Sequence, residues 1–271
     1  MKRSWYAAPY GLWMLIFTLL PLVFVVYFAL TNPEGRVTAE NLADFIQPNY
    51  LNILGLSVYL AFLCTIICLL IGYPAAYILA SKDFSKNQTL FVLILLPMWM
   101  NFLLRTYAMM SLLEDSGIIN SFLKSMGLDP LQMIGTQGAV LFGMVYNFVP
   151  FMILPIHTSL KKMDARVIEA AEDLGANPMN VFFRVVFPLS VPGIISGVTM
   201  VFMPAVTTFA ISRLLGSGMF MLFGDVIEKQ FLEFNNWNFG SALSLIMMLL
   251  IIASVGLLNR ADPKKEGGGA W

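Results

Sequence analysis

The chain has 271 residues, of which 58% are hydrophobic and 12% are charged, and its mean hydropathy is +0.77. Soluble domains carry about 25% charged residues, so this composition excludes a soluble domain and indicates an integral membrane protein. The 16 basic and 16 acidic side chains balance, so the net charge indicates no partner, and only the positions of the charges are informative.

Apolar runs long enough to cross a bilayer recur along the chain. About 20 helical residues, at 1.5 Å each, span a hydrocarbon core of roughly 30 Å. The predicted spans are about 10–30, 51–80, 90–113, 138–158, 191–212 and 241–258. The first run is too long for the core of a signal peptide, and we interpret it as a retained span. We therefore expect an all-α membrane protein with six transmembrane helices in a single domain, 1–271.

Within the second run, Gly72-Tyr73-Pro74 predicts a kink, because proline interrupts helical hydrogen bonding. Cys64 and Cys68 lie four residues apart in the same run, so they share one helix face. We interpret them as small packing residues, because the sequence has neither a disulfide framework nor a zinc-binding pattern. The third run contains Arg105, the charged residue that lies well inside a predicted span.

The segment 164–189 is the longest charged interval between two apolar blocks. Asp164 is suited to cap a short helix, and Gly175 stands where a helix end requires positive φ. Asn177 followed by Pro178 is suited to start a second short helix. An apolar stripe is predicted on the first helix, formed by Val167, Ile168, Ala170, Ala171 and Leu174.

The Lys and Arg residues are distributed unevenly between the two alternating sets of loops. The set that includes both termini and the segment 164–189 holds eleven, and the other set holds four. By the positive-inside rule, both termini and the segment 164–189 are expected in the cytoplasm. The opposite loops carry nine acids against their four bases, so the outer face is expected to be negative.

One local pattern resembles the EAA loop of ABC importer permeases. In that family, Glu-Ala-Ala is followed by three residues, a glycine, nine residues and then Ile-x-Leu-Pro. The chain has Glu169-Ala170-Ala171, then Gly175, and later Val185 and Phe187-Pro188, so apolar residues replace the isoleucine and the leucine. The resemblance implies a coupling helix that docks on a cytoplasmic ATPase. The residues assigned to docking are Glu169, Ala170, Ala171, Asp173, Leu174 and Gly175. The alternative is an ordinary amphipathic loop.

The resemblance extends over nearly the whole chain, to the spermidine/putrescine importers and to the first of their two permease subunits. It rests on Gly72-Tyr73-Pro74, the segment from Pro97 to Arg105, Met203-Pro204-Ala205, Gly224 to Phe231, Trp237 and Phe239-Gly240. It implies the type I, binding-protein-dependent permease fold in the bacterial cytoplasmic (inner) membrane. The implied partners are a pair of ATPase subunits, a second permease, an external polyamine-binding protein, the polyamine itself and membrane lipid, with no nucleic acid.

The sequence has no G-x-x-x-x-G-K-[ST] motif, so the chain is expected to be non-catalytic. ATP and Mg²⁺ are expected in the partner ATPase, and this chain is expected to bind no cofactor or metal. Other solutes remain open as cargo in the same architecture, among them ferric ion, thiamine and sulfate. A six-span channel, a membrane enzyme and a secondary transporter are more distant alternatives, because their characteristic motifs, catalytic clusters or internal repeats are missing from the sequence.

Aromatic and amide side chains in the third and fourth runs are candidates for contact with a polyamine. Aromatic faces attract ammonium groups, and amide oxygens accept hydrogen bonds from them. The candidates are Trp99, Asn101, Tyr107, Tyr146 and Asn147, together with Asp225 and Glu228 of the last outer loop. Interfacial placement and helix capping are the competing interpretations. Arg105 is either a pathway or gate residue, or an arginine that snorkels outwards or pairs with Glu114 or Asp115.

Overall fold

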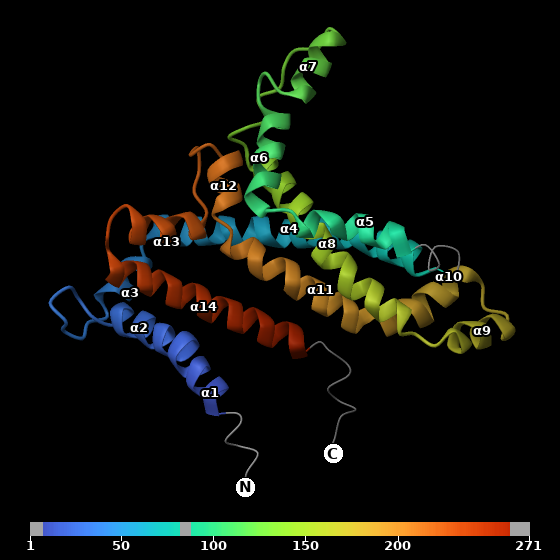
Figure 1. Ribbon diagram of the computed structural model, residues 1–271, viewed down its shortest axis with the longest axis horizontal. Helices are drawn as coiled ribbons and strands as arrows, with labels where there is room; N and C mark the ends of the chain where they lie inside the picture. Colours follow the sequence, from blue (N-terminus) through green and yellow to red (C-terminus); the bar gives the residue numbers. More distant parts are fainter. Residues whose placement is uncertain (1–7, 82–87, 261–271) are drawn as a thin grey trace.

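The computed structural model describes residues 8–81 and 88–260, and helices account for most of them (Figure 1). The N-terminal helices are α1 (Ala8–Met14) and α2 (Leu20–Ala29), joined by a π-helical turn at Leu15–Leu19, and then α3 (Glu40–Phe45), α4 (Pro48–Ala80) and α5 (Gln88–Trp99). The middle of the chain forms α6 (Phe102–Leu113), α7 (Ile118–Ser125), α8 (Gln137–Lys161), α9 (Ala165–Asp173) and α10 (Pro178–Val181). After a π-helical turn at Phe182–Val186 follow α11 (Phe187–Thr207), α12 (Ala210–Leu215), α13 (Phe223–Leu232) and α14 (Trp237–Arg260).

Five helical stretches are long and apolar enough to cross a membrane. They are Tyr10–Ala29, Pro48–Ala80, Gln137–Lys161, Pro178–Thr207 and Trp237–Leu258. A sixth span results if the bent pair Phe91–Trp99 and Phe102–Ser125 is counted as one. The expected all-α membrane architecture is therefore confirmed for the described residues.

The third predicted span is not one continuous helix. Its two halves, α5 and α6, meet at 98° (Figure 1). Pro97 disturbs the end of α5, because proline lacks an N–H and crowds the carbonyl four residues earlier. Asn101 then starts α6, since its side-chain oxygen accepts from the N–H groups of Leu103 and Leu104 at 2.8 and 3.4 Å. The sequence interpretation expected one continuous span over about 90–113 and did not predict this break.

The fifth span also differs from the expectation of about 191–212. The helix already begins at Pro178 and continues to Thr207 through the π-helical turn that precedes Pro188. The shorter α12 follows and carries Arg213, which the sequence interpretation placed in a connection. Pro188 has no N–H to donate to the turn that precedes it. That turn is the wider π-helical one, and the helix continues through it instead of ending.

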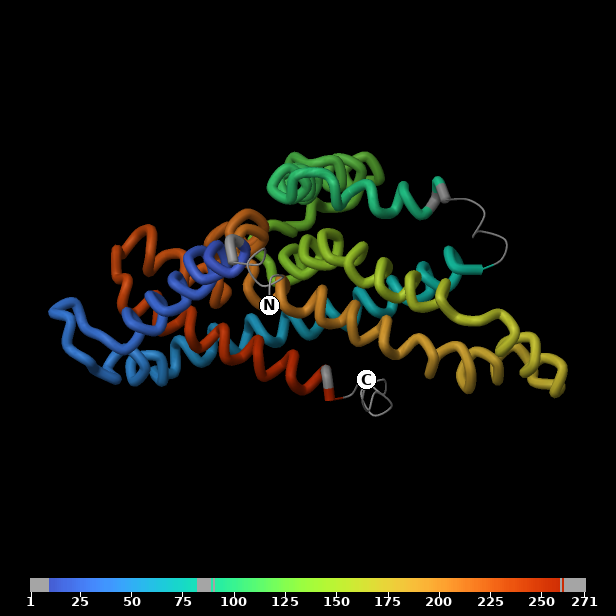
Figure 2. The backbone as a smooth tube through the Cα atoms, turned by 60° about the horizontal axis from the view of Figure 1, so that its bottom comes forward, coloured from blue at the N-terminus to red at the C-terminus, as the bar shows by residue number. Residues whose placement is uncertain are grey.

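The core is formed by α4, α8 and α11, which pack against one another, while α2 packs on α14 (Figures 1 and 2). Small residues allow the close approach. Gly193 of α11 lies so near α8 that an added Cβ would be 2.5 Å from Ser159 Cβ. Cys64 and Cys68 of α4 are buried free thiols in this core, as the packing interpretation predicted. The helix α4 runs through Pro74 as a single element.

Candidate functional sites

The helix α9 is closed at both ends by the predicted local interactions. The Asp164 carboxylate accepts from the Arg166 N–H at 3.0 Å, which caps the first turn. At the other end, Gly175 has φ +80°, its N–H donates to the carbonyl of Glu172, and the N–H of Ala176 donates to the carbonyl of Ala171. These two bonds form a Schellman motif, which ends a helix sharply and turns the chain away.

The predicted apolar stripe of α9 is divided between two faces. Ile168 and Ala171 pack against the core, whereas Val167 and Leu174 are 44% and 89% exposed. Ala170 is exposed as well, so an outward apolar edge runs along residues i, i+3 and i+7. The predicted docking residues Glu169, Asp173 and Gly175 are also exposed. Five of the six predicted docking residues are therefore exposed, and the sixth, Ala171, faces inwards.

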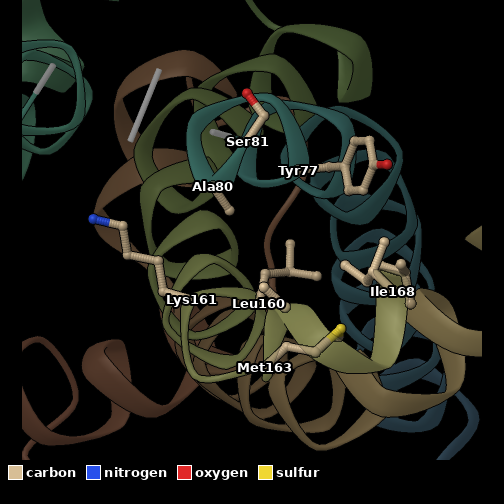
Figure 3. Close-up of a pocket in the computed structure, with 9 residues that line it drawn as sticks. Tyr77, Ala80, Ser81, Leu160, Lys161, Met163 and Ile168 are labelled. Atoms are coloured by element: carbon tan, nitrogen blue, oxygen red, sulfur yellow. The ribbon is translucent and has the colours of Figure 1, made fainter. Parts of the chain in front are cut away.

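A pocket of about 340 Å³ separates α9 from the ends of α4 and α8 (Figure 3). Ala80, Leu160, Met163 and Ile168 point towards its centre, and Tyr77, Ser81 and Lys161 stand at its rim (Figure 3). The helix α9 therefore rests on the bundle through a few apolar contacts and not through continuous packing.

The candidate pathway residues of α5, α6 and α8 fall into two groups. Trp99, Tyr107 and Tyr146 are 81%, 49% and 36% exposed. Asn147 is fully buried, with Nδ2 donating to the carbonyl of Gly143 at 2.9 Å and Oδ1 without a partner. Asn101 serves as the cap of α6. The structure thus gives Asn101 a structural role and leaves the aromatic side chains accessible.

Arg105 is 5% exposed, and its Nε and Nη1 atoms have no hydrogen-bond partner among the described residues. In that part of the chain it forms no ion pair with Glu114 or Asp115. Because the side chain is buried, it does not reach outwards as the snorkelling interpretation requires. A buried guanidinium without an acceptor is also costly, so it calls for a partner.

The two acidic candidates near α13 have partners within the chain. Asp225 is 6% exposed, and its Oδ2 accepts from the Leu222 N–H at 2.7 Å, which caps α13. Burial raises the pKa of Asp225, while the hydrogen bonds from Leu222 and Ser212 act in the opposite direction. Glu228 accepts a hydrogen bond from Arg213 at 2.9 Å. Both carboxylates therefore hold the connection between α11 and α14 together.

The sequence interpretation did not single out a pocket at the opposite end of the bundle from α9. Asp44, Gln47 and Tyr50, at the junction of α3 and α4, meet Gln230 from α13 there. The sequence contained one signal for it, because Gln230 lies in the segment Gly224 to Phe231 that carries part of the resemblance.

The fold and the short capped helix between the fourth and fifth spans define a class of membrane transport subunits. Residues 69–266 match the family described as binding-protein-dependent transport system inner membrane component, and the chain belongs to this family. It is a multi-pass inner-membrane protein and a permease subunit.

Among curated proteins, the chain is 38% identical over 258 residues to the spermidine/putrescine transport system permease protein PotB of Haemophilus influenzae, covering 92% of this chain and 90% of that one. It is 34% identical over 263 residues to PotB of Escherichia coli, covering 92% and 96%. A solved bacterial ABC transporter for the acidic polysaccharide alginate has the same fold, with a TM-score of 0.77 at 17% identity and 96% of each chain covered. A second alginate transporter structure, with a pentasaccharide-bound periplasmic protein, gives a TM-score of 0.76 at 16% identity, covering 99% of this chain and 98% of the other.

Proposed function

We propose that this chain is one of two permease subunits of an ATP-driven importer that moves spermidine or putrescine inwards. The relatives named as spermidine/putrescine permeases support this cargo, at 34–38% identity over 92% of the chain. The observation that carries the coupling role is the outward edge of α9, where Leu174 is 89% exposed beside a Schellman stop at Gly175.

The helix α9 is proposed to face the cytoplasm, with both termini on the same side. The distribution of eleven Lys and Arg against four supports this orientation. A pair of ATPase subunits would bind ATP and Mg²⁺ and receive α9 on their surface. An exposed apolar edge flanked by acids is suited to such a contact, because apolar anchors surrounded by polar groups dominate interface energies. This chain would bind no cofactor and catalyse no reaction.

The exposed aromatic side chains Trp99, Tyr107 and Tyr146 are proposed to line the route of the ammonium groups, whereas Asn147 is fully buried and is not proposed to line it. Asp225 and Glu228 are proposed to stabilise the fold around α13 and not to contact the polyamine, since both already have partners within the chain. Arg105 is proposed to meet an acceptor supplied by the second permease, because it has none among the described residues of this chain.

The coupling role is tested by replacing Leu174 with Asp in the complete importer. The variant should insert normally, because the side chain is exposed, but it should no longer copurify with the ATPase pair. Val37→Asp is the matched control, because Val37 is 85% exposed and lies in the connection after α2, far from α9. If the Leu174 variant binds the ATPase as the wild type does, the docking role is wrong.

The cargo is tested with the wild-type complex and an external binding protein in proteoliposomes. ATP hydrolysis should rise when the binding protein carries spermidine or putrescine. If the complex assembles but responds only to another solute, the polyamine assignment is wrong and the permease role stands. If the chain purifies without an ATPase or second permease, the coupling role is wrong.

A further inference from the structure

The pocket opposite α9, which we call the amide pocket, is about 460 Å³ in volume. The junction of α3 and α4 lies beside the junction of α13 and α14 (Figure 1), and residues from both junctions line the pocket. Polar and aromatic side chains make up its lining: Asp44, Gln47, Tyr50, Gln230, Phe234, Asn236 and Phe239. No lysine or arginine belongs to this lining among the described residues, so a positively charged ligand is favoured over an anion.

Gln230 is the residue on which the inference chiefly depends. It is 8% exposed, yet its side-chain amide makes no hydrogen bond to any described residue. Its backbone is fixed, because its carbonyl accepts from the Asn236 N–H at 2.8 Å and its Cβ packs against Gly240. Among the described residues, the buried side-chain atoms without a partner belong to Arg105 and Asn147, so the unbonded Gln230 amide keeps some accessible surface, and its oxygen is available to a donor that enters the pocket.

Asp44 supplies the charge. It is exposed, and one of its oxygens accepts a weak bond from Gln47 Nε2 at 3.4 Å. This bond leaves the other Asp44 oxygen and the Gln47 amide oxygen as acceptors. Asn236 is already committed, because its side-chain oxygen accepts from the Phe239 N–H at 3.1 Å. The nearby Lys229 lies outside the lining and is 4.0 Å from Glu233.

Aromatic rings form the apolar part of the pocket. Tyr50 and Phe239 pack edge to face with their centroids 5.1 Å apart, and Phe234 is 64% exposed beside them. Ring faces attract ammonium groups and also cover methylene chains. A hard metal ion gains nothing from such rings, since it prefers a full set of oxygen ligands.

We propose that the amide pocket binds one ammonium end of a linear polyamine, on the face of the membrane opposite α9. The ammonium group would donate to Asp44, Gln47 and Gln230, and the adjoining methylenes would lie against Tyr50 and Phe239. The choice of polyamine rests on the proposed function, whereas the choice of an alkylammonium rests on the pocket itself. The pocket would hold the cargo after its release from the external binding protein.

The test uses the assembled importer in nanodiscs without the binding protein, and radiolabelled spermidine is bound at equilibrium. Asp44→Asn should weaken binding about tenfold, because it removes the one charge of the pocket while keeping its shape. Gln230→Met should weaken it several-fold, and Gln230→Glu should strengthen it, because a second carboxylate then faces the ammonium. Glu34→Gln is the matched control, since Glu34 lies in the connection before α3, is exposed and does not line the pocket.

Unchanged spermidine binding in the Asp44 variant would overturn the inference, as would equal losses in the Asp44 and Glu34 variants. Asp44 is exposed, so its substitution is not expected to unfold the protein, and the unfolding temperature of each variant verifies this. If polyamine is transported but the pocket variants bind and transport normally, the inference fails while the proposed function stands. If another solute is the cargo and spermidine binding still depends on Asp44 and Gln230, the cargo proposal fails while the pocket stands.

Discussion

The hydroxyl groups of Tyr73 on α4 and Ser190 on α11 lie 3.0 Å apart inside the bundle. Ser190 also donates to the carbonyl of Phe187 at 2.8 Å, so the Tyr73 hydroxyl is the donor of the bond between them. The Tyr73 ring packs edge to face on Phe182, whose π-helical turn continues from the short helix after α9. The second and fifth spans are therefore joined next to the element that leads to α9.

Replacing Tyr73 with Phe should reduce the stability of the bundle by about 1 kcal/mol, because the ring contacts remain and one buried hydrogen bond is lost. Thermal unfolding of the purified complex measures this change. The double variant Tyr73→Phe with Ser190→Ala should lose less than the sum of the two single losses, because both act on the same bond. Fully additive losses would show that the two hydroxyls do not interact.

Replacing Gly175 with Val should abolish transport and leave membrane insertion intact. An added Cβ meets no atom within 4 Å, so the cost arises from the φ of +80°. Left-handed backbone costs a residue with a Cβ roughly 1–2 kcal/mol, and the turn after α9 would change direction. Gly175→Asn is the control, because Asn tolerates this conformation, and it should retain most of the ATP-driven uptake. Normal uptake by the Val variant would refute the role of this turn.

Replacing Gly193 with Ala should destabilise the core by about 1–3 kcal/mol, because the new methyl group would overlap α8. Its Cβ would lie 2.9 Å from the carbonyl oxygen of Pro155, which is backbone and cannot move aside easily. The unfolding temperature in detergent measures the loss. Gly55→Ala in α4 is the matched control, since nothing lies within 4 Å of its added Cβ, and it should leave stability unchanged or raise it.

The raised pKa of Asp225 predicts that the stability of the protein depends on pH. Burial raises its pKa above the ordinary value of 3.8, so the folded protein keeps the proton to higher pH than the unfolded chain does. The resulting stabilisation is fully present below 3.8 and is lost as the pH rises through the raised pKa. Asp225→Asn keeps an acceptor for the Leu222 N–H but does not titrate.

The unfolding temperature of the wild type should therefore fall relative to that of the Asn variant when the pH is raised from about 4 to about 7. Asp225→Ala should be less stable at every pH, by about 1 kcal/mol, because it loses the cap of α13. A difference between wild type and the Asn variant that stays constant with pH would contradict the raised pKa.

The sequence by itself determined the membrane class, the six apolar runs, the caps of α9 and the N-cap of α10. Hydrophobic length is a local property, and Asp164, Gly175 and Asn177 act on backbone groups only two or three residues away. For the same reason Asn101 could be noticed in the third run, although the 98° angle between α5 and α6 depends on what each helix packs against.

Tertiary structure alone decided which face each residue presents. The apolar stripe of α9 was visible in the sequence, but only the fold placed Ile168 on the inner side, facing the pocket at the ends of α4 and α8, and left Leu174 exposed. Likewise, Glu228 received Arg213 as its partner, and Gln230 was buried beside Asp44 from the other end of the chain. Such pairings depend on long-range packing, because a periodic pattern sets the spacing of side chains but does not specify which element covers them.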